Sequence, residues 1–307
     1  MSSPSISLII PVRNAAHLLP GCVASIRGMD YSAQKLELLV VDNGSTDDSS
    51  SVARELGATV LSESQPGPYA ARNCGAAAAR GDILAFTDAD CVLDPGWATA
   101  VEQAMGRYDA ACGLSLGASG GLIAGLIQQR YEANLRGRAG AIPPRPVFDT
   151  RNAAVTRAMF ERVKGFDARL DDFSDDLFGI AVVQAGGRLA LREDMVVTHI
   201  HPETLRGVWR RQVRHGRAIP QVLAFYPPEV TRHFPGITRH RWLHGRHIGC
   251  RLGRAAVAGG TFLAGFALGA ALRLTLRVGS LHLSRRLFDL FNRFGTVYGM
   301  ATAPPIS

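Results

Sequence analysis

The strongest constraint on the fold of this chain is a repeated change in the spacing of its apolar residues between residues 6 and 87. Short apolar stretches at Ile6–Ile10, Leu36–Val41, Ala58–Ser62 and Ile83–Thr87 alternate with segments whose apolar residues recur at helical spacing. Short runs of this kind are typical of buried strands. Strands that alternate with helices form a mainly parallel sheet flanked by helices. The sequence therefore predicts an α/β domain.

Polar loops follow three of these predicted strands at the point where each strand ends. They are Pro11–Asn14, Asp42–Ser45 and Asp88–Asp90. Because ligands of such sheets bind beyond the carboxyl ends of the strands, we expect the loops to form one site. Asp88 and Asp90 are carboxylates separated by one residue, which suits Mg²⁺ or Mn²⁺ with a diphosphate. Helix capping or a solvated turn is the alternative for this pair.

The net charge of +8 over 307 residues is distributed unevenly. Residues 1–130 carry −5, residues 131–202 are neutral, and residues 203–307 carry +13. Such an asymmetry indicates an anionic partner for the last third, either a nucleic acid or a membrane surface. The five cysteines have no CxxC spacing, which argues against a disulfide framework or a structural zinc site and favours the cytosol.

The last third also contains a long uncharged segment. Residues 255–272 carry no charge and are bounded by arginines on both sides. This length reaches the lower limit for a helix that spans a bilayer, roughly 17–25 residues. The following stretch, 281–294, is basic and amphipathic. We expect a helical, membrane-associating extension at the cytoplasmic face of the membrane, peripheral or with a single span through about 255–272. A soluble helical hairpin is the alternative.

Longer motifs resemble those of one enzyme family. Ser7–Asp47 contains SLIIPVRNAAHLLPGCVASI and LELLVVDNGSTD, and Gly67–Cys91 reads GPYAARNCGAAAARGDILAFTDADC. Further on come FDTRNAAVTRAMFERVKGFDARLDDFSDD and MVVTHIHPETLRGVWRRQVRHGRA. In this order, over about residues 5–220, these motifs resemble the family 2 glycosyltransferases of GT-A fold. The resemblance implies transfer of a sugar from a nucleotide-diphosphate sugar to a hydroxyl acceptor, with inversion and with Mn²⁺ or Mg²⁺.

The resemblance also implies a site for the nucleotide-sugar. Asp42 and Asn43 stand where the family usually has two acids that contact the base or ribose, and Asn43 retains the hydrogen bonding without the charge. Arg72 would reach the nucleotide or its diphosphate. The expected nucleotide-sugar residues are Pro11, Arg13, Asn14, Asp42, Asn43, Arg72, Asp88, Ala89 and Asp90, of which Asp88 and Asp90 would also hold the metal.

The family's acidic pair near the acceptor corresponds to Asp175 and Asp176. One carboxylate of this pair removes the proton of the acceptor hydroxyl, and we assign that role to Asp176. A solvated acidic loop is the alternative. A histidine that follows a strand completes the metal site in many members, and His199 is preferred here over His201.

A predicted helix over Leu205–Ala218 resembles the family's Arg/Gln-rich helix behind the acceptor site. Its Arg211, Arg214 and His215 would hold a diphosphate or an anionic acceptor. A basic face that lies on the membrane is the alternative interpretation of these side chains.

Together these features predict two domains. Residues 1–220 would form the GT-A domain, with a nucleotide-sugar half (about 1–110) and an acceptor half (about 111–220), and residues 221–307 the basic extension. The expected partners are a nucleotide-diphosphate sugar, a hydroxyl acceptor of the lipid-linked or envelope-glycan type and an anionic membrane surface, with no nucleic acid. Two alternatives remain: a nucleotidyltransferase acting on sugar phosphates, and a non-catalytic nucleic-acid-binding protein.

Overall fold

The computed structural model describes residues 6–118, 121–135, 140–141, 148–200, 204–231, 251–278 and 281–303. The chain forms two compact units. Unit 1 comprises Met1–Ala118, Tyr131–Arg169 and Ser174–Ile200, and unit 2 comprises Ser119–Arg130, Leu170–Phe173 and His201–Ser307. The division near residue 200 therefore groups the helix that begins at Leu205 with the C-terminal helices, whereas the sequence placed it in the N-terminal domain.

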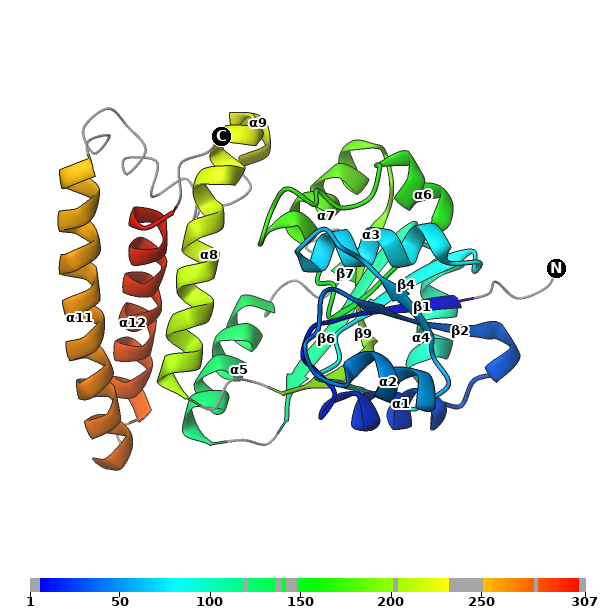
Figure 1. Cartoon of the computed structure of the whole chain (residues 1–307), viewed down its shortest axis with the longest axis horizontal. Helices are drawn as coiled ribbons and strands as arrows, with labels where there is room; N and C mark the ends of the chain where they lie inside the picture. The colour runs from blue at the N-terminus through cyan, green and yellow to red at the C-terminus, as the bar shows by residue number, and fades with distance from the viewer. Residues whose placement is uncertain are drawn as a thin grey trace. The chain divides into compact units, whose positions relative to one another are not determined.

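Unit 1 is built on one nine-stranded sheet (Figure 1). Its strands lie in the order β3-β2-β1-β4-β8-β6-β9-β5, and β7 pairs with β9. Strands β1 to β4 are parallel, β8 runs antiparallel to β4 and β6, and β6 and β9 are parallel again. The predicted α/β fold is confirmed. The strands are β1 (Ile6–Val12), β2 (Leu36–Asp42), β3 (Thr59–Ser62), β4 (Ile83–Thr87), β5 (Cys91–Leu93), β6 (Ala110–Gly117), β7 (Gly140–Ala141), β8 (Asn152–Thr156) and β9 (Leu189–His199).

Helices cover both faces of this sheet because its strands are apolar on both sides. In β1, Ile6, Leu8 and Ile10 belong to the core under α1, α2 and α4. Ile9, between them, belongs to the core under α3, α6 and α7, as the alternation of side chains along a strand requires. The helices are α1 (Leu19–Arg27), α2 (Ser49–Glu55), α3 (Pro68–Ala78), α4 (Trp97–Met105), α6 (Arg157–Arg162) and α7 (Ser174–Gln184), with a 3₁₀ turn at Ala33–Lys35.

The parallel strands deliver the predicted polar loops to one edge of the sheet. The register of β1 and β2 pairs Val12 with Asp42, so the residues that follow each strand emerge side by side. Strand β4 is parallel to β1 and ends at Thr87, directly before Asp88. The convergence that the sequence predicted is therefore present in the fold.

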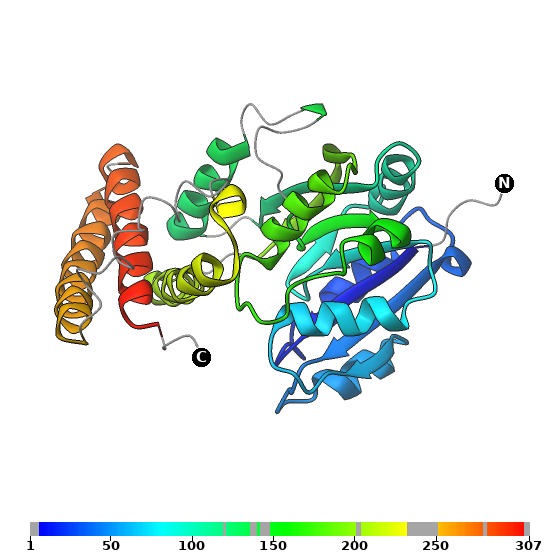
Figure 2. The ribbon, with the colours of Figure 1, turned by 90° about the horizontal axis from the view of Figure 1, so that it is seen from above.

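Unit 2 is helical. Helices α8 (Leu205–Phe225), α11 (Arg251–Val278) and α12 (Leu281–Ala301) lie side by side in both views (Figures 1 and 2). Helix α8 runs past its predicted end at Ala218 and contains Pro220. Buried Leu and Phe side chains of all three helices form a core with Leu126 and Ile127 of α5 (Leu122–Leu135). A short helix, α9 (Pro228–Thr231), follows α8.

Helix α11 includes the whole uncharged segment 255–272 that the sequence put forward as a span. Among the residues that the structure describes, no helix is both long enough and apolar enough to cross a membrane.

Candidate active site

Hydrogen bonds around Asn14 join the loops that follow β1 and β2. Asn14 has a φ of 55°, in the left-handed region that asparagine tolerates better than most residues. Its Oδ1 accepts bonds from the backbone N–H (2.7 Å) and the hydroxyl (3.2 Å) of Thr46, and its own N–H donates to Ser45 Oγ (3.0 Å). Pro11 is half buried and Arg13 is exposed. The two loops therefore form one connected wall at the edge of the sheet.

Asp42 is held inside this wall. Its Oδ1 accepts a bond from the Ser45 N–H (2.9 Å), and its Oδ2 accepts one from the Ser50 hydroxyl. Partial burial works against the charge of Asp42, but these hydrogen bonds outweigh it and lower the pKa of the carboxyl group. Asp42 is therefore an ionised, oriented carboxylate at the expected nucleotide position.

Asn43 holds the loop that leads into α3. The side chain is buried, and its Nδ2 donates to the carbonyl oxygens of Glu63 (2.9 Å) and Gln65 (2.7 Å). Its Oδ1 accepts a bond from the Gly67 N–H (2.8 Å). An ionised aspartate accepts hydrogen bonds but donates none, so the two carbonyl groups account for asparagine here. This positioning role was not predicted from the sequence, and the contact of Asn43 with a nucleotide stays a prediction.

Arg72 connects α3 to the Asp88-Ala89-Asp90 motif. The residue is only 4% exposed, and its Nη2 lies 2.5 Å from Asp88 Oδ1. Its guanidinium carbon lies 5.7 Å from the centre of the Tyr69 ring. Desolvation raises the pKa of Asp88 against the opposing charge of Arg72. The buried Arg72 Nε has no hydrogen-bond partner among the described residues, although buried donors are nearly always paired.

The acidic pair Asp175 and Asp176 lies in the first turn of α7. Carboxylates at this end of a helix are stabilised by the helix dipole. The Oδ1 of Asp175 accepts bonds from the Tyr69 hydroxyl (3.0 Å) and from the Asp176 N–H (3.0 Å). Because Tyr69 and Arg72 lie one turn apart on α3, this helix contacts both the acidic pair and Asp88.

Strand β9 brings a histidine to the second carboxylate of the motif. Cys91 of β5 pairs with His199 of β9, and His199 Nε2 lies 3.3 Å from Asp90 Oδ2. His199 is buried, and Ala89 between the two acids is buried as well. Burial works against the charge of Asp90, but the hydrogen bond with His199 outweighs it and lowers the pKa of the carboxyl group.

Asp90 and His199 are suited to a divalent cation. Among the described residues, no three Asp, Glu, His or Cys side chains are grouped so as to hold a metal ion. Asp88 is engaged by Arg72, but the contact of Asp90 with His199 places an oxygen and a nitrogen donor together. Two protein ligands leave coordination positions for diphosphate oxygens. The donor set therefore fits Mn²⁺ or Mg²⁺ bound with a nucleotide diphosphate, and His201 lies outside the described residues.

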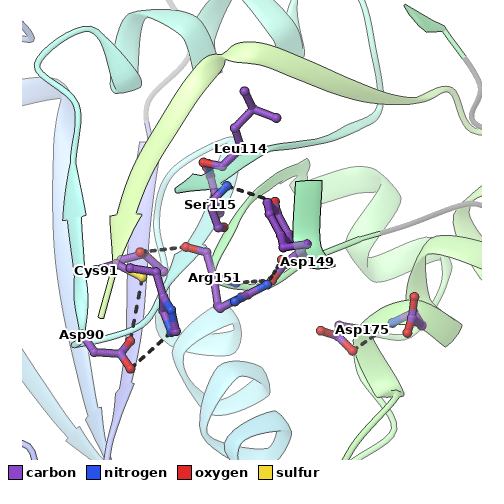
Figure 3. Close-up of polar contacts among 12 residues, drawn as sticks. Asp90, Cys91, Leu114, Ser115, Asp149, Arg151 and Asp175 are labelled. Carbon is purple, nitrogen blue, oxygen red and sulfur yellow. Dashed lines mark hydrogen bonds and ion pairs between the residues drawn. The ribbon is translucent and has the colours of Figure 1, made fainter. Parts of the chain in front are cut away.

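A second ion pair, which the sequence analysis missed, lies at the end of β4. Asp149 accepts bonds from Nε (2.9 Å) and Nη2 (2.5 Å) of Arg151 (Figure 3). The Arg151 guanidinium carbon lies 5.5 Å from the Tyr131 ring centre, and the Thr87 hydroxyl donates to the Arg151 carbonyl (2.9 Å). Burial opposes both charges, but pairing lowers the pKa of Asp149 and raises that of Arg151. In the sequence, this ion pair is indicated only by the opposite charges of Asp149 and Arg151, which are separated by one residue.

The predicted acceptor residues Arg211, Arg214 and His215 lie on α8 in unit 2. Within this unit, His215 Nδ1 lies 3.0 Å from Asp172 Oδ2, and the His215 ring contacts that of Phe173 at a tilt of 40°, with 4.2 Å between ring centres. Burial works against the charge of Asp172, but the hydrogen bond from His215 lowers the pKa of this carboxyl. His215 is therefore held by a protein carboxylate, Arg211 is half buried and Arg214 is exposed.

The sequence of this chain is similar to those of known glycosyltransferases. Glycosyltransferase AglE of Haloferax volcanii is 30% identical over 234 residues, which cover 71% of this chain and 74% of that protein. The pre-mycofactocin glycosyltransferase of Mycobacterium tuberculosis is 31% identical over 251 residues, 75% of this chain. The match covers 50% of that mycobacterial relative, so this chain spans about half of its length.

The fold is also similar to those of solved enzymes. The mannosyltransferase PcManGT from Pyrobaculum calidifontis, solved in complex with GDP-Man and Mn²⁺, has a TM-score of 0.64 at 22% identity and covers 97% of this chain and 86% of its own. The TarS 1-349 structure of S. aureus has a TM-score of 0.56 at 16% identity and covers 96% of this chain and 90% of its own. The family model "Glycosyl transferase family 2" matches residues 7–163. This chain belongs to glycosyl transferase family 2.

Proposed function

We propose that this glycosyltransferase transfers a sugar from a nucleotide-diphosphate sugar to a hydroxyl acceptor with inversion at the anomeric carbon. The observation that carries the proposal is the position of α3 between two carboxylate motifs. Its Arg72 pairs with Asp88 of the expected donor motif, and its Tyr69 bonds Asp175 of the expected catalytic pair. One helix thus contacts both the motif expected to hold the donor and the acidic pair expected to act on the acceptor.

Asp176 is the proposed general base. Its carboxylate takes the proton of the acceptor hydroxyl as that oxygen attacks the anomeric carbon opposite the diphosphate. The bond from the anomeric carbon to the diphosphate oxygen breaks, and its electron pair leaves with the nucleotide diphosphate. Asp175 acts as a positioning residue, because its Oδ1 accepts bonds from Tyr69 and from the Asp176 N–H.

The charge that develops on the leaving diphosphate requires positive partners. Arg72, whose guanidinium lies beside Asp88, supplies one positive charge next to the expected donor motif. A divalent cation held by Asp90 and His199, with Asp88 beside them, would neutralise the leaving group when bound. Around the base and ribose we place the wall formed by Pro11, Arg13, Asn14 and Asp42.

A donor panel tests this proposal. The purified full chain is incubated with GDP-mannose and with UDP-sugars, because structural neighbours were solved with GDP-Man and with UDP. Release of nucleotide diphosphate is measured with Mn²⁺, with Mg²⁺ and after chelation, and the anomeric configuration of the product is determined. We expect cation-dependent release from one nucleotide class and an inverted product. Release from no donor, or retained configuration, would contradict the proposal.

We also propose that unit 2 associates with the cytoplasmic face of a membrane, where a lipid-linked or envelope glycan would be the acceptor. Residues 203–307 carry a net charge of +13, which attracts anionic lipid. On α11, Phe262, Leu263 and Phe266 are 51%, 70% and 77% exposed and share one face. Co-sedimentation with anionic vesicles is expected, and it should weaken in Phe266→Ser. Equal sedimentation of the natural protein and of Phe266→Ser would contradict the proposed contact between α11 and the membrane.

A further inference from the structure

The residues that precede β8 lie opposite the expected donor motif within unit 1. In the antiparallel register of β4 with β8, Thr87 pairs with Asn152. The next positions beyond this pair are Asp88 and Arg151, and opposed Cα atoms in such a ladder are roughly 4.5–5.5 Å apart. The Thr87 hydroxyl donates to the Arg151 carbonyl (2.9 Å) at this point. Desolvation raises the pKa of Asp88, and the charges of Arg72 and Arg151 both act against that rise.

Arg151 is held in one orientation, but part of its guanidinium group remains accessible. Its Nε and Nη2 donate to Asp149, and its guanidinium carbon lies over the Tyr131 ring. Among the described residues, Nη1 of Arg151 neither makes a hydrogen bond nor is fully buried. The side chains of Arg151 and Asp149 are 24% and 16% exposed. The ion pair therefore presents oriented N–H groups that a ligand can reach.

Asp149 and Tyr131 add further hydrogen-bonding groups to this cluster. Asp149 Oδ2 accepts one hydrogen bond, from Arg151, and a carboxylate oxygen can accept two. Burial works against the charge of Asp149, but pairing with Arg151 lowers its pKa, so Asp149 is an ionised acceptor at neutral pH. The Tyr131 hydroxyl accepts a bond from the Ser115 N–H (3.0 Å), and a phenol can also donate. The cluster thus combines donors and acceptors without a net charge.

We propose that Asp149, Arg151 and Tyr131 bind hydroxyl groups of the donor sugar and select which sugar is transferred. The inference rests on the proposed function, in which the donor motif holds the nucleotide diphosphate. Because the opposite charges of the pair cancel, it attracts a further phosphate only weakly, whereas a sugar hydroxyl both donates to the carboxylate and accepts from the guanidinium. In the view of Figure 3 the pair lies between Asp90 and Asp175, as a sugar would lie between its diphosphate and the acceptor. A sugar without a hydroxyl at this place would leave the charged groups unpaired.

Calorimetric titration of the full chain with Mn²⁺ present tests the inference. The probes are two matched sets, GDP-mannose with GDP and UDP-glucose with UDP, so that the members of each set differ by the sugar. Arg151→Lys keeps a positive charge opposite Asp149 but removes the planar fork of nitrogen donors. We expect this variant to bind the nucleotide sugar about tenfold more weakly, as for one lost hydrogen bond to a charged group. Its affinity for the nucleotide diphosphate should not change.

Arg192 provides a matched control. It pairs with Asp194 through Nε (2.9 Å) and Nη2, again with one residue between the two charges, and its side chain is also 24% exposed. Arg192→Lys should leave both affinities unchanged. Tyr131→Phe is a second test variant that leaves the ion pair in place and removes only the hydroxyl. It should also weaken binding of the nucleotide sugar alone.

Three results would overturn the inference. Equal weakening of nucleotide sugar and nucleotide diphosphate in Arg151→Lys would place this residue at the diphosphate. Unchanged affinity for the nucleotide sugar in both Arg151→Lys and Tyr131→Phe would exclude contact with the sugar. The same loss in Arg192→Lys as in Arg151→Lys would show an effect that is not local to the site. Failure of the proposed function is a separate observation, the release of nucleotide diphosphate from no donor by the natural protein.

Discussion

Asn43 shows at the scale of one residue how a buried amide holds a loop of the candidate site. Asn43→Asp would replace the donor group with a carboxylate that faces the carbonyl oxygens of Glu63 and Gln65. We expect a loss of about 1–3 kcal/mol in the free energy of unfolding, because two buried acceptors lose their donor. Urea denaturation at neutral pH measures this change.

Asn14 provides a matched control for that substitution. In its hydrogen bonds with Thr46, the Asn14 side chain acts as an acceptor, a role that an aspartate carboxylate can also fill. Aspartate also tolerates the positive φ of this position. Asn14→Asp should therefore change the free energy of unfolding by much less than Asn43→Asp. Similar losses in the two variants would show that the donor group of Asn43 is not what stabilises the loop.

The Asp149–Arg151 pair gives a prediction about pH. Arg151→Met would leave a buried carboxylate unpaired, which costs about 3–5 kcal/mol of stability at pH 7. In the natural protein the lowered pKa of Asp149 adds stability above about pH 4, and this stability is lost as the pH falls through the pKa of Asp149 in the folded state. In Arg151→Met the pKa of Asp149 rises, so acidification protonates the unpaired carboxylate and removes its cost. The free energies of unfolding of the natural protein and of the variant should therefore become more similar as the pH is lowered from 7 to 4. A constant difference would contradict the pairing.

Helix α3 is the element on which the proposed reaction depends. Tyr69→Phe retains the ring beside Arg72 and removes only the hydroxyl that bonds Asp175. We expect kcat to fall about tenfold, the equivalent of one hydrogen bond to a charged group, while KM for the donor changes little. A rise in KM with unchanged kcat would place Tyr69 in donor binding instead.

The crossing of α8 and α12 is set by glycine. Gly216→Ala would place a methyl group against the Thr296 carbonyl, so we expect a loss of more than about 1 kcal/mol from forced displacement of the helices. Gly259→Ala on α11, where nothing lies within 4 Å, should gain up to about 1 kcal/mol. Thermal unfolding monitored by circular dichroism compares Gly216→Ala with Gly259→Ala. Equal shifts in Tm for the two variants would contradict the close packing of α8 against α12.

Elements whose signal is local could be predicted from the sequence. The apolar runs of β1, β2 and β4 and the polar loops after them were predicted because period and strand ends are local properties. The hydrogen bonds from Asn43 to the loop before α3 and the bond from Tyr69 to Asp175 could not be predicted, because each joins residues that only the fold brings together. Helix α8 continues past its predicted end because Pro220 is buried within it, so packing outweighs the local preference for a helix break.

At the scale of the whole molecule, the uneven charge follows the two units. The acidic residues predicted for chemistry lie in unit 1, with Asp88, Asp90, Asp175 and Asp176 at the ends of its strands and the start of α7. The excess of arginine lies in unit 2, where the exposed apolar face of α11 also lies. This division agrees with our proposal that sugar transfer takes place in unit 1 and that unit 2 contacts an anionic membrane surface.

The most direct test of the proposed reaction is the turnover of Asp176→Asn with the donor and acceptor that the natural protein uses. Loss of the general base should lower kcat by about 10²–10⁴-fold and leave the affinity for nucleotide diphosphate unchanged. Glu161→Gln, an exposed acid on α6, serves as the control and should retain full turnover. Turnover of Asp176→Asn equal to that of the control would contradict the assignment of Asp176 as the base.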